Sequence, residues 1–388
     1  MKLTDVLTRC IDKADSVIEI IKEDAFGSHQ NKELKRKFSI TQAAKMIGVS
    51  REAIRLAEKT GRIAPPKTII KNRKVYDLSE INVLRDQFGT RPLRKKGDEP
   101  FILLFMNFKG GVRKTTISVH QAQYLALKGY KVLLIDADSQ ASATAMFGLT
   151  PDMDLSEDET MHGFLTGEKD SLDYCIKKTY WDGIDLIPSN LTLYDVEYII
   201  TKQAYSGSSN EFYKRLRKGI DGIKENYDFI IIDAPPSLGL ISINLIYAAD
   251  GIIVPMPPII QDFCSTRMFF DLVRSVISEI QEREFKFVKL LISKNDGYPH
   301  TEAFIRYIKE VFSSDLILNS YFRDTQEIPK AAMTLQSLYE FTGAKSNETN
   351  KRALNIINTI CHEIETLITS SWPSGHGSIK RAEEAMIW

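Results

Sequence analysis

The sequence predicts an α/β fold, with a mostly parallel sheet flanked by helices, preceded by a smaller α-helical unit that carries a hairpin. From Phe101 onward, short apolar runs alternate with helical stretches, which is typical of strands that are buried on both faces and connected by helices. The runs are Phe101–Met106, Lys131–Ile135, Ile184–Ile187, Phe229–Ile232, Gly251–Val254 and Val288–Ile292. In such sheets ligands bind at the carboxyl ends of the strands.

The chain is long enough for two or three units, because 388 residues exceed the usual size of one domain. Residues 3–22 place apolar side chains on one stripe at helical spacing. This stripe has to be buried either against the rest of the chain or against the same helix of a second copy. We therefore expect residues 1–37 to be an amphipathic helix and linker and a candidate dimerisation segment. Residues 38–97 would form a second unit and residues 98–388 the α/β unit.

Charge and cysteine content narrow the class of protein. Lys and Arg total 51, as do Asp and Glu, so any basic surface has to be local. Positive charge concentrates at residues 32–37, 67–74 and 91–96. The four cysteines are far apart without a C-x-x-C pair, which argues against a disulfide framework or zinc site and fits a reducing cytoplasm. No apolar run approaches the ~18 residues of a membrane span, so we expect a cytoplasmic protein without a membrane partner.

The strongest motif lies between the first apolar run and the following helical stretch, Ile117–Leu127. Gly110 and Gly111 let backbone N–H groups close on phosphate oxygens, and the helix N-terminus adds a positive dipole. Lys114 would reach the β- and γ-phosphates, and the Thr115 hydroxyl would coordinate Mg²⁺. The predicted ATP-binding loop comprises Lys109, Gly110, Gly111, Val112, Arg113, Lys114, Thr115 and Thr116.

Carboxylates end two further predicted strands. Asp136 and Asp138 are two residues apart, so strand alternation sends both to the same side. One could join a metal shell and the other could position an attacking water, since phosphoryl transfer depends on positioning and charge stabilisation. Asp233 ends the apolar run Phe229–Ile232 and precedes two prolines that stiffen the exit loop. This is the Walker B pattern, in which a carboxylate holds Mg²⁺.

The loop departs from the common GxxxxGK[ST] pattern because it opens on Lys109 and has Arg113 before Lys114. An opening lysine marks the deviant Walker A group, and the sequence resembles the ParA/MinD superfamily of dimerising ATPases. Within it, the chain is similar to ParA partition proteins with a long N-terminal domain. The resemblance implies that Lys109 reaches across a dimer interface to the partner's nucleotide, with Lys109, Lys114 and Asp138 as the catalytic set. It also implies that Asp138 acts on the water and Asp136 in the magnesium shell.

The same resemblance extends by motif order over residues 100–370. It implies an adenine contact near Asn295 and a nucleotide- and dimer-bordering segment at residues 321–330, although ordinary loop polarity explains either stretch equally well. Arg113 stands where the family has a small residue, and its effect on the loop or on hydrolysis is open. The cofactors implied are ATP and Mg²⁺.

Residues 40–55 fit two helices joined by a tight turn, in which Gly48 permits the turn and Ser50 caps the second helix. The basic stretch 69–76 fits a hairpin that could reach the DNA backbone or minor groove. The unit resembles winged helix-turn-helix domains of the MerR-like kind, although similar units also serve as protein-interaction modules. The candidate DNA contacts here are Thr41, Ser50, Arg51, Glu52, Arg55, Lys71, Arg73 and Lys74.

Basic residues near the end of the chain are candidates for non-specific DNA contact, with a solvated charged face as the alternative. They are Lys330, Lys345, Lys351 and Arg352.

The resemblance implies a nucleoid-associated partition ATPase that dimerises with ATP, binds DNA and is stimulated by a ParB-like centromere-binding protein. Its N-terminal unit would repress its own operon at a specific operator. The main alternative is a nucleotide-sensing transcriptional repressor without a segregation role. An electron-transfer ATPase would need cysteines that hold a cluster, and Cys175 and Cys264 are not in suitable motifs. A MinD-like membrane role would need a C-terminal amphipathic anchor, for which Ser378–Trp388 offers only a weak face.

Overall fold

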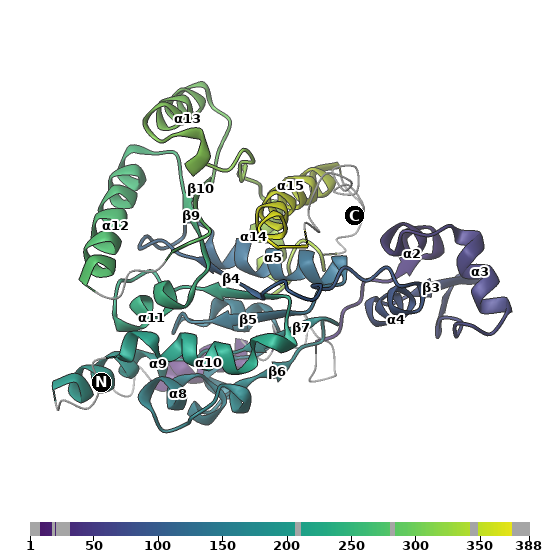
Figure 1. The fold of residues 1–388 in the computed structure, drawn as a ribbon, viewed down its shortest axis with the longest axis horizontal. Coiled ribbons are helices and arrows are strands. Elements are labelled where there is room, and N and C mark those ends of the chain that lie inside the picture. Colours follow the sequence, from purple (N-terminus) through teal and green to yellow (C-terminus); the bar gives the residue numbers. More distant parts are fainter. Residues whose placement is uncertain are drawn as a thin grey trace.

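The computed structural model (Figure 1) describes residues 8–17, 20, 32–205, 211–279, 284–341 and 348–374. Residues 8–17 are helical, as the apolar stripe predicts, and the rest of the expected 3–22 helix lies almost wholly outside the described residues. Ile11 and Val17 are 59% and 53% exposed. These two side chains of the stripe are therefore not covered by the other described residues.

The N-terminal unit is a three-stranded antiparallel sheet, in the order β1-β3-β2, with three helices. Its elements are β1 (Phe38–Ser39), α2 (Ile40–Ile47), α3 (Arg51–Lys59), β2 (Thr68–Ile70), β3 (Arg73–Tyr76) and α4 (Leu78–Phe88). Gly48 ends α2 at φ 81°, and the Ser50 hydroxyl accepts from Ala53 N to cap α3. Lys71 and Asn72 turn the β2–β3 hairpin at positive φ, as a two-residue turn of type I′ requires. The predicted helix–turn–helix and hairpin are both present.

The α/β unit is built on a seven-stranded sheet in the order β10-β9-β4-β8-β5-β7-β6. All neighbours are parallel except β6 and β7. The strands are β4 (Phe101–Phe105), β5 (Val132–Asp136), β6 (Lys177–Lys178), β7 (Ile184–Ile187), β8 (Phe229–Asp233), β9 (Gly251–Met256) and β10 (Phe287–Ile292). The mostly parallel sheet is confirmed, and each of the six predicted runs forms a strand. The antiparallel edge β6 was not predicted.

Helices cover both faces of this sheet, as Figure 1 shows. They are α5 (Lys114–Lys128), α6 (Ser142–Met146), α7 (Pro151–Asp154), α8 (His162–Thr166), α9 (Leu193–Tyr205), α10 (Arg215–Ile223), α11 (Leu240–Ala248), α12 (Ile260–Glu279), α13 (Pro299–Val311), α14 (Glu327–Ala332) and α15 (Glu348–Ser370). Successive strand residues enter different cores: Phe229 and Ile231 pack with α5 and α15, whereas Ile230 and Ile232 pack with α10 and α11. None of the described helices combines the length and apolar character needed to cross a bilayer.

Buried polar contacts join the two units. The Arg85 side chain of α4 is only 2% exposed as a residue and donates to Met46 O at the end of α2 and to Leu127 O at the end of α5. These carbonyls lie in the last turns of their helices, where no intrahelical donor reaches them. Asn82 adds a hydrogen bond of 2.6 Å to Asp182. One guanidinium therefore caps two helices that belong to different units.

The stretches on either side of the N-terminal unit are both tied to the α/β unit. Lys32 is 8% exposed, and its ammonium donates to Met146 O and Leu335 O and pairs with Glu340 at 3.1 Å. Arg94 donates through Nε to the carbonyl of Tyr227, next to the start of β8. The cationic side chains of Lys32 and Arg94 thus bind groups of the α/β unit, and composition alone does not predict these contacts.

Candidate nucleotide site

The strand register brings the predicted motifs to one edge of the sheet. In adjacent parallel strands Phe105 pairs with Asp233, and Asp233 pairs with Asp136. Neighbouring strands lie about 4.8 Å apart, so the loop after β4 and the two carboxylates are side by side. This is the carboxyl edge of the sheet, as predicted.

The loop from Asn107 to Arg113 leads directly into α5, whose first residue is Lys114. Gly111 and Arg113 both have positive φ, at 70° and 79°. Glycine adopts this conformation freely, whereas another residue pays about 1 kcal/mol or more. Arg113 therefore holds the loop in a conformation that a glycine would favour more.

Lys114 is the central cation of the site. It is 6% exposed, and its ammonium donates to the carbonyl of Lys109 across the loop at 3.0 Å. Burial lowers the pKa of Lys114, while the nearby carboxylates of Asp233 and Asp138 oppose that shift. The ammonium and the two carboxylates thus form one electrostatic cluster.

Asp136 and Asp233 are fully buried but differ in their partners. Asp136 accepts hydrogen bonds of 2.8 Å from both the backbone N–H and the hydroxyl of Thr144, and one of 3.2 Å from Asp138 N. Neither oxygen of Asp233 has a hydrogen-bond partner among the described residues. Burial raises the pKa of both groups, and Asp136 raises that of Asp233 further.

These carboxylates fit a divalent cation. A buried carboxylate without a donor is costly unless a cation compensates it, and carboxylate and hydroxyl oxygens are the ligands that Mg²⁺ prefers. The Thr115 hydroxyl lies near Asp233 without meeting hydrogen-bond geometry, yet it is close enough to oppose the rise in the pKa of Asp233. Asp233 has the free oxygens, so it is better placed than Asp136 for a direct or water-mediated metal contact.

Asp138 follows β5 at the rim of the same cluster and is partly exposed. One of its carboxylate oxygens accepts from Gln140 N at 3.0 Å, and its carbonyl accepts from the Ser189 hydroxyl at 2.7 Å. Ser189 N in turn donates to the Thr144 hydroxyl. Sequence reasoning missed Thr144 and Ser189, which have no motif of their own and fix the two aspartates through hydrogen bonds.

Lys109 forms an ion pair with Asp262 at the start of α12. Its side chain is 38% exposed, whereas that of Asp262 is 6% exposed. The neighbouring Asn107 accepts from Lys109 N at 3.1 Å and donates to Pro255 O at 2.8 Å. The opening lysine is thus held within its own chain by an acidic residue that follows β9.

Arg113 links the loop to the segment after β10. Its guanidinium donates to Asp324 at 2.9 Å and lies over the ring of Phe322, 5.8 Å from the centroid. The predicted nucleotide-bordering segment 321–330 therefore does lie beside the loop. The residue that departs from the family pattern is the one that makes this contact.

The Asn295 side chain is 1% exposed. Its amide nitrogen donates to Glu302 at 3.0 Å, and its oxygen accepts from Gly297 N at 2.9 Å. Both ends of the side chain are thus used, one by its own loop and the other by Glu302 in the first turn of α13. The adenine contact near this residue stays a prediction.

All eight candidate DNA contacts of the N-terminal unit are exposed. They are Thr41, Ser50, Arg51, Glu52, Arg55, Lys71, Arg73 and Lys74. The Ser50 hydroxyl is occupied as the cap of α3, and Lys74 pairs with Glu58 at 2.6 Å. Arg51 and Arg55 on α3, with Lys71 and Arg73 at the hairpin, therefore carry the positive charge best placed for a phosphate backbone.

The C-terminal candidates among the described residues are also exposed, but they do not all carry free charge. Lys330 pairs with Glu327 at 2.8 Å, and Arg352 lies 3.9 Å from Glu348. Lys351 is exposed on α15. Lys345 lies outside the described residues.

Comparison with known proteins decides the family. Protein SopA of Escherichia coli (strain K12) is 34% identical over 386 residues, and the match covers 96% of this chain and 99% of that protein. This chain belongs to the ParA-type partition ATPase family that includes SopA. Residues 101–287 of this ParA-type chain also match the family described as an AAA domain.

Two solved structures share the ParA-type fold. One, described as a partition protein, has a TM-score of 0.66 at 19% identity and covers 94% of this chain and 99% of its own. The other is cobyrinic acid a,c-diamide synthase from Mycobacterium smegmatis with a bound ATP analogue and magnesium. It has a TM-score of 0.51 at 24% identity and covers 60% of this chain and 94% of its own.

Proposed function

We propose that this ParA-type protein is a plasmid or DNA partition ATPase that hydrolyses ATP with Mg²⁺ and dimerises when ATP binds. The observation that carries the proposal is the Asp233 carboxylate, fully buried with no hydrogen-bond partner among the described residues, beside Asp136 and the Lys114 loop. A buried carboxylate of this kind is stabilised when a cation binds to it. The residues around Asp233 are of the types that bind a triphosphate in a phosphate-binding loop.

Different residues of the site would bind the phosphates, hold the metal ion and position the attacking water. Backbone N–H groups of Gly110 to Lys114 and the N-terminus of α5 would hold phosphate oxygens. Lys114 would compensate the β- and γ-phosphate charge, and Thr115, Asp136 and Asp233 would hold the metal shell. Bound Mg²⁺ would neutralise negative charge on the phosphoryl group. Asp138, at the rim of the cluster, would hold the attacking water in line.

Dimerisation would release Lys109 from its own chain. The ion pair with Asp262 gives the lysine a stable position in the monomer, and its partial exposure leaves it free to exchange partners. In the ATP-bound dimer Lys109 would reach the partner's nucleotide. The ion pair between Lys109 and Asp262 would therefore be present in the monomer and broken in the ATP-bound dimer.

The N-terminal unit would act as a winged helix-turn-helix domain that reads an operator and represses the protein's own operon. Exposed Arg51 and Arg55 on α3 support a major-groove role, and the Lys71–Arg73 hairpin tip supports a backbone contact. Non-specific DNA binding by the ATP-bound dimer and stimulation of weak ATPase activity by a ParB-like centromere-binding protein complete the proposal.

The test is the molar mass in solution, measured by light scattering with no nucleotide, ADP or ATP, each with Mg²⁺. We expect a dimer with ATP and a loss of that shift in Lys109→Ala. Lys131→Ala is the matched control, because Lys131 is an exposed lysine next to β5, at the edge of the sheet away from the loop. A molar mass that does not respond to ATP would contradict the proposal.

DNA binding and turnover separate the partition role from a nucleotide-sensing repressor. Arg51→Ala with Arg55→Ala should abolish operator binding and leave ATP-dependent non-specific binding in place, whereas Lys59→Ala on the same helix should change neither. The affinity for non-specific DNA should fall steeply with salt, because each phosphate contact contributes about −0.9 to the slope of log affinity against log salt. Operator binding with no ATP turnover, with or without DNA and a ParB-like protein, would favour the repressor.

A further inference from the structure

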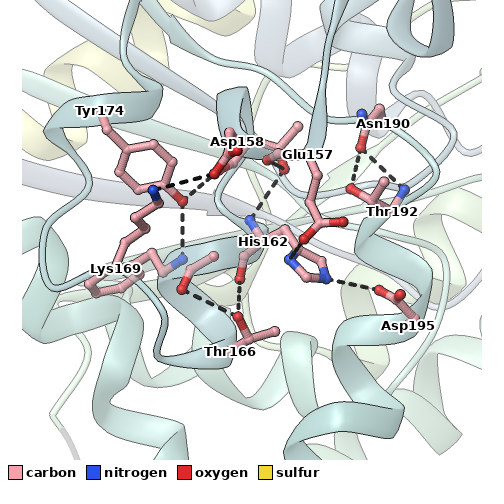
Figure 2. Close-up of polar contacts among 12 residues, drawn as sticks. Glu157, Asp158, His162, Thr166, Lys169, Tyr174, Asn190, Thr192 and Asp195 are labelled. Atoms are coloured by element: carbon pink, nitrogen blue, oxygen red, sulfur yellow. Dashed lines mark hydrogen bonds and ion pairs between the residues drawn. The ribbon is translucent and has the colours of Figure 1, made fainter.

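A second cluster of metal-ligating side chains lies away from the nucleotide loop. It is formed by the short 3-10 helix η1 (Glu157–Glu159), by α8 and by the residue two positions after α8. Figure 2 shows His162 at its centre, between Glu157 and Asp195. The His162 ring belongs to a residue that is 2% exposed. A buried imidazole among carboxylates needs a cation, either a proton or a metal.

One ring nitrogen is already fixed by its partner. Nε2 of His162 lies 3.0 Å from Oδ1 of Asp195 on α9, within hydrogen-bond geometry. The Nε2–H group donates to this carboxylate and orients the ring. The lone pair of the neutral ring is then on Nδ1.

Nδ1 faces ligands rather than a hydrogen-bond donor. It lies 3.0 Å from Oε1 of Glu157, yet among the described residues it has no partner within hydrogen-bond geometry. The exposed Glu168 brings a third ligand atom, and the three atoms of Glu157, His162 and Glu168 lie within 4.8 Å of one another. The Glu157 carboxylate therefore lies beside the Nδ1 lone pair, and Glu168 adds a second carboxylate to the same cluster.

We propose that Glu157, His162 and Glu168 bind a divalent first-row transition-metal ion, with Zn²⁺ as the representative. Zn²⁺ accepts imidazole nitrogen and carboxylate oxygen, and three protein ligands leave one position for water. Mg²⁺ prefers oxygen ligands alone, so an imidazole favours the transition metal. The site contains no cysteine and lies outside the nucleotide loop.

The residue that binds the other ring nitrogen of His162 also fits a metal site. A histidine that binds a metal commonly donates its other N–H to a carboxylate, which fixes the tautomer and the ring orientation. Asp195 occupies that position. With a neutral ring, Glu157 and Glu168 contribute two negative charges, which a divalent ion neutralises.

The surrounding loop is held in place without the ion. Backbone N–H groups of Glu168 and Lys169 donate to Gly163 O at 2.8 and 2.9 Å. Lys169 pairs with Asp158 at 3.3 Å, and Tyr174 donates to Thr160 O at 2.7 Å. In Figure 2 Lys169 points to Asp158 and not into the space beside Nδ1. Lys169 therefore leaves the ligand carboxylates available.

Co²⁺ is the probe, because it reports nitrogen and oxygen coordination by visible absorption and Zn²⁺ displaces it. Full-length protein without a histidine tag is stripped of metal and titrated with Co²⁺ in excess Mg²⁺ and without nucleotide. We expect one Co²⁺ per chain and its release by one equivalent of Zn²⁺. Mg²⁺ in excess keeps the carboxylates of the nucleotide site from contributing.

Four variants and a control locate the site. His162→Gln, Glu157→Gln and Glu168→Gln should each abolish the absorption, and Asp195→Asn should weaken Co²⁺ binding about 10- to 100-fold. His300→Gln is the control, because His300 is exposed on α13 and should bind Co²⁺ like the unaltered chain. Glu168 is also exposed, so its variant tests the proposal even if His162→Gln does not fold.

A thermal scan gives a second readout. Zn²⁺ should raise the unfolding temperature of the unaltered chain and of His300→Gln but leave Glu168→Gln unchanged, because a ligand that binds only the folded state stabilises it. Absorption that persists in both His162→Gln and Glu168→Gln would overturn the proposal. Equally, no Co²⁺ absorption at millimolar metal would show that a proton, not a metal, holds His162 between its carboxylates. Neither outcome bears on ATP-dependent dimerisation.

Discussion

His120 should make the stability of the α/β unit depend on pH between about 4 and 6.5. It lies in α5 and is 1% exposed. Its Nε2 accepts from Leu338 N at 3.1 Å, so the proton of the neutral ring is on Nδ1, which donates to Thr116 O at 2.6 Å. Burial lowers the pKa of His120 from 6.5 to about 4.

The sign follows from proton binding. Between pH 6.5 and 4 the unfolded chain binds a proton at His120 that the folded chain does not, so stability falls as the pH falls through this window. With the two pKa values above, the loss between pH 7 and pH 5 is about 2 kcal/mol. Above pH 7 this contribution should be constant.

Urea unfolding at pH 7 and pH 5 measures this loss through tryptophan fluorescence. Trp181 and Trp372 are 1% and 4% exposed within the α/β unit, so they report its unfolding. His120→Gln retains an acceptor for Leu338 N but does not titrate. The drop in unfolding free energy between the two pH values should therefore be about 2 kcal/mol smaller in this variant. His300→Gln should behave like the unaltered chain, and an equal drop in all three proteins would refute the reasoning.

Three further substitutions test the fold by the same urea measurement at pH 7. Lys32→Met should cost about 3 kcal/mol, because it leaves Glu340 buried without its cation; no change would mean that residues 32–37 are not anchored. Gly183→Ala should cost about 2 kcal/mol or more, since φ is 91° and the new Cβ would lie 2.9 Å from Tyr130 O. Ile231→Ala removes a fully buried side chain of the central strand β8 and should cost about 4 kcal/mol. A loss below about 1 kcal/mol would place Ile231 outside the core.

The sheet could be predicted because its strands are apolar on both faces. The run at residues 184–187 matches β7 at both ends, and Asp136 and Asp233 prove to be the last residues of β5 and β8. The antiparallel strand β6 has only two residues, both lysines. An edge strand this short has no alternation to detect, so its pairing depends on tertiary contacts.

The phosphate loop and the aspartates could be placed because each follows a predicted strand. Their partners could not, because these lie far along the chain. Asp262 carries no motif of its own, yet it pairs with Lys109, and Asp324 pairs with Arg113 across 211 positions. Lys32 was assigned to a linker for the same reason, since a lysine among polar residues gives no sign that a pocket elsewhere buries it.

The contact of Arg85 with Leu127 O has a thermodynamic consequence. Leu127 lies near the end of α5, a helix of 15 residues and about 22 Å, whose first residue is Lys114. If ATP changes the affinity of the N-terminal unit for DNA through this helix by some factor, DNA must change the affinity for ATP by the same factor. Under the operator binding proposed above, the operator would be an allosteric effector as well as a target.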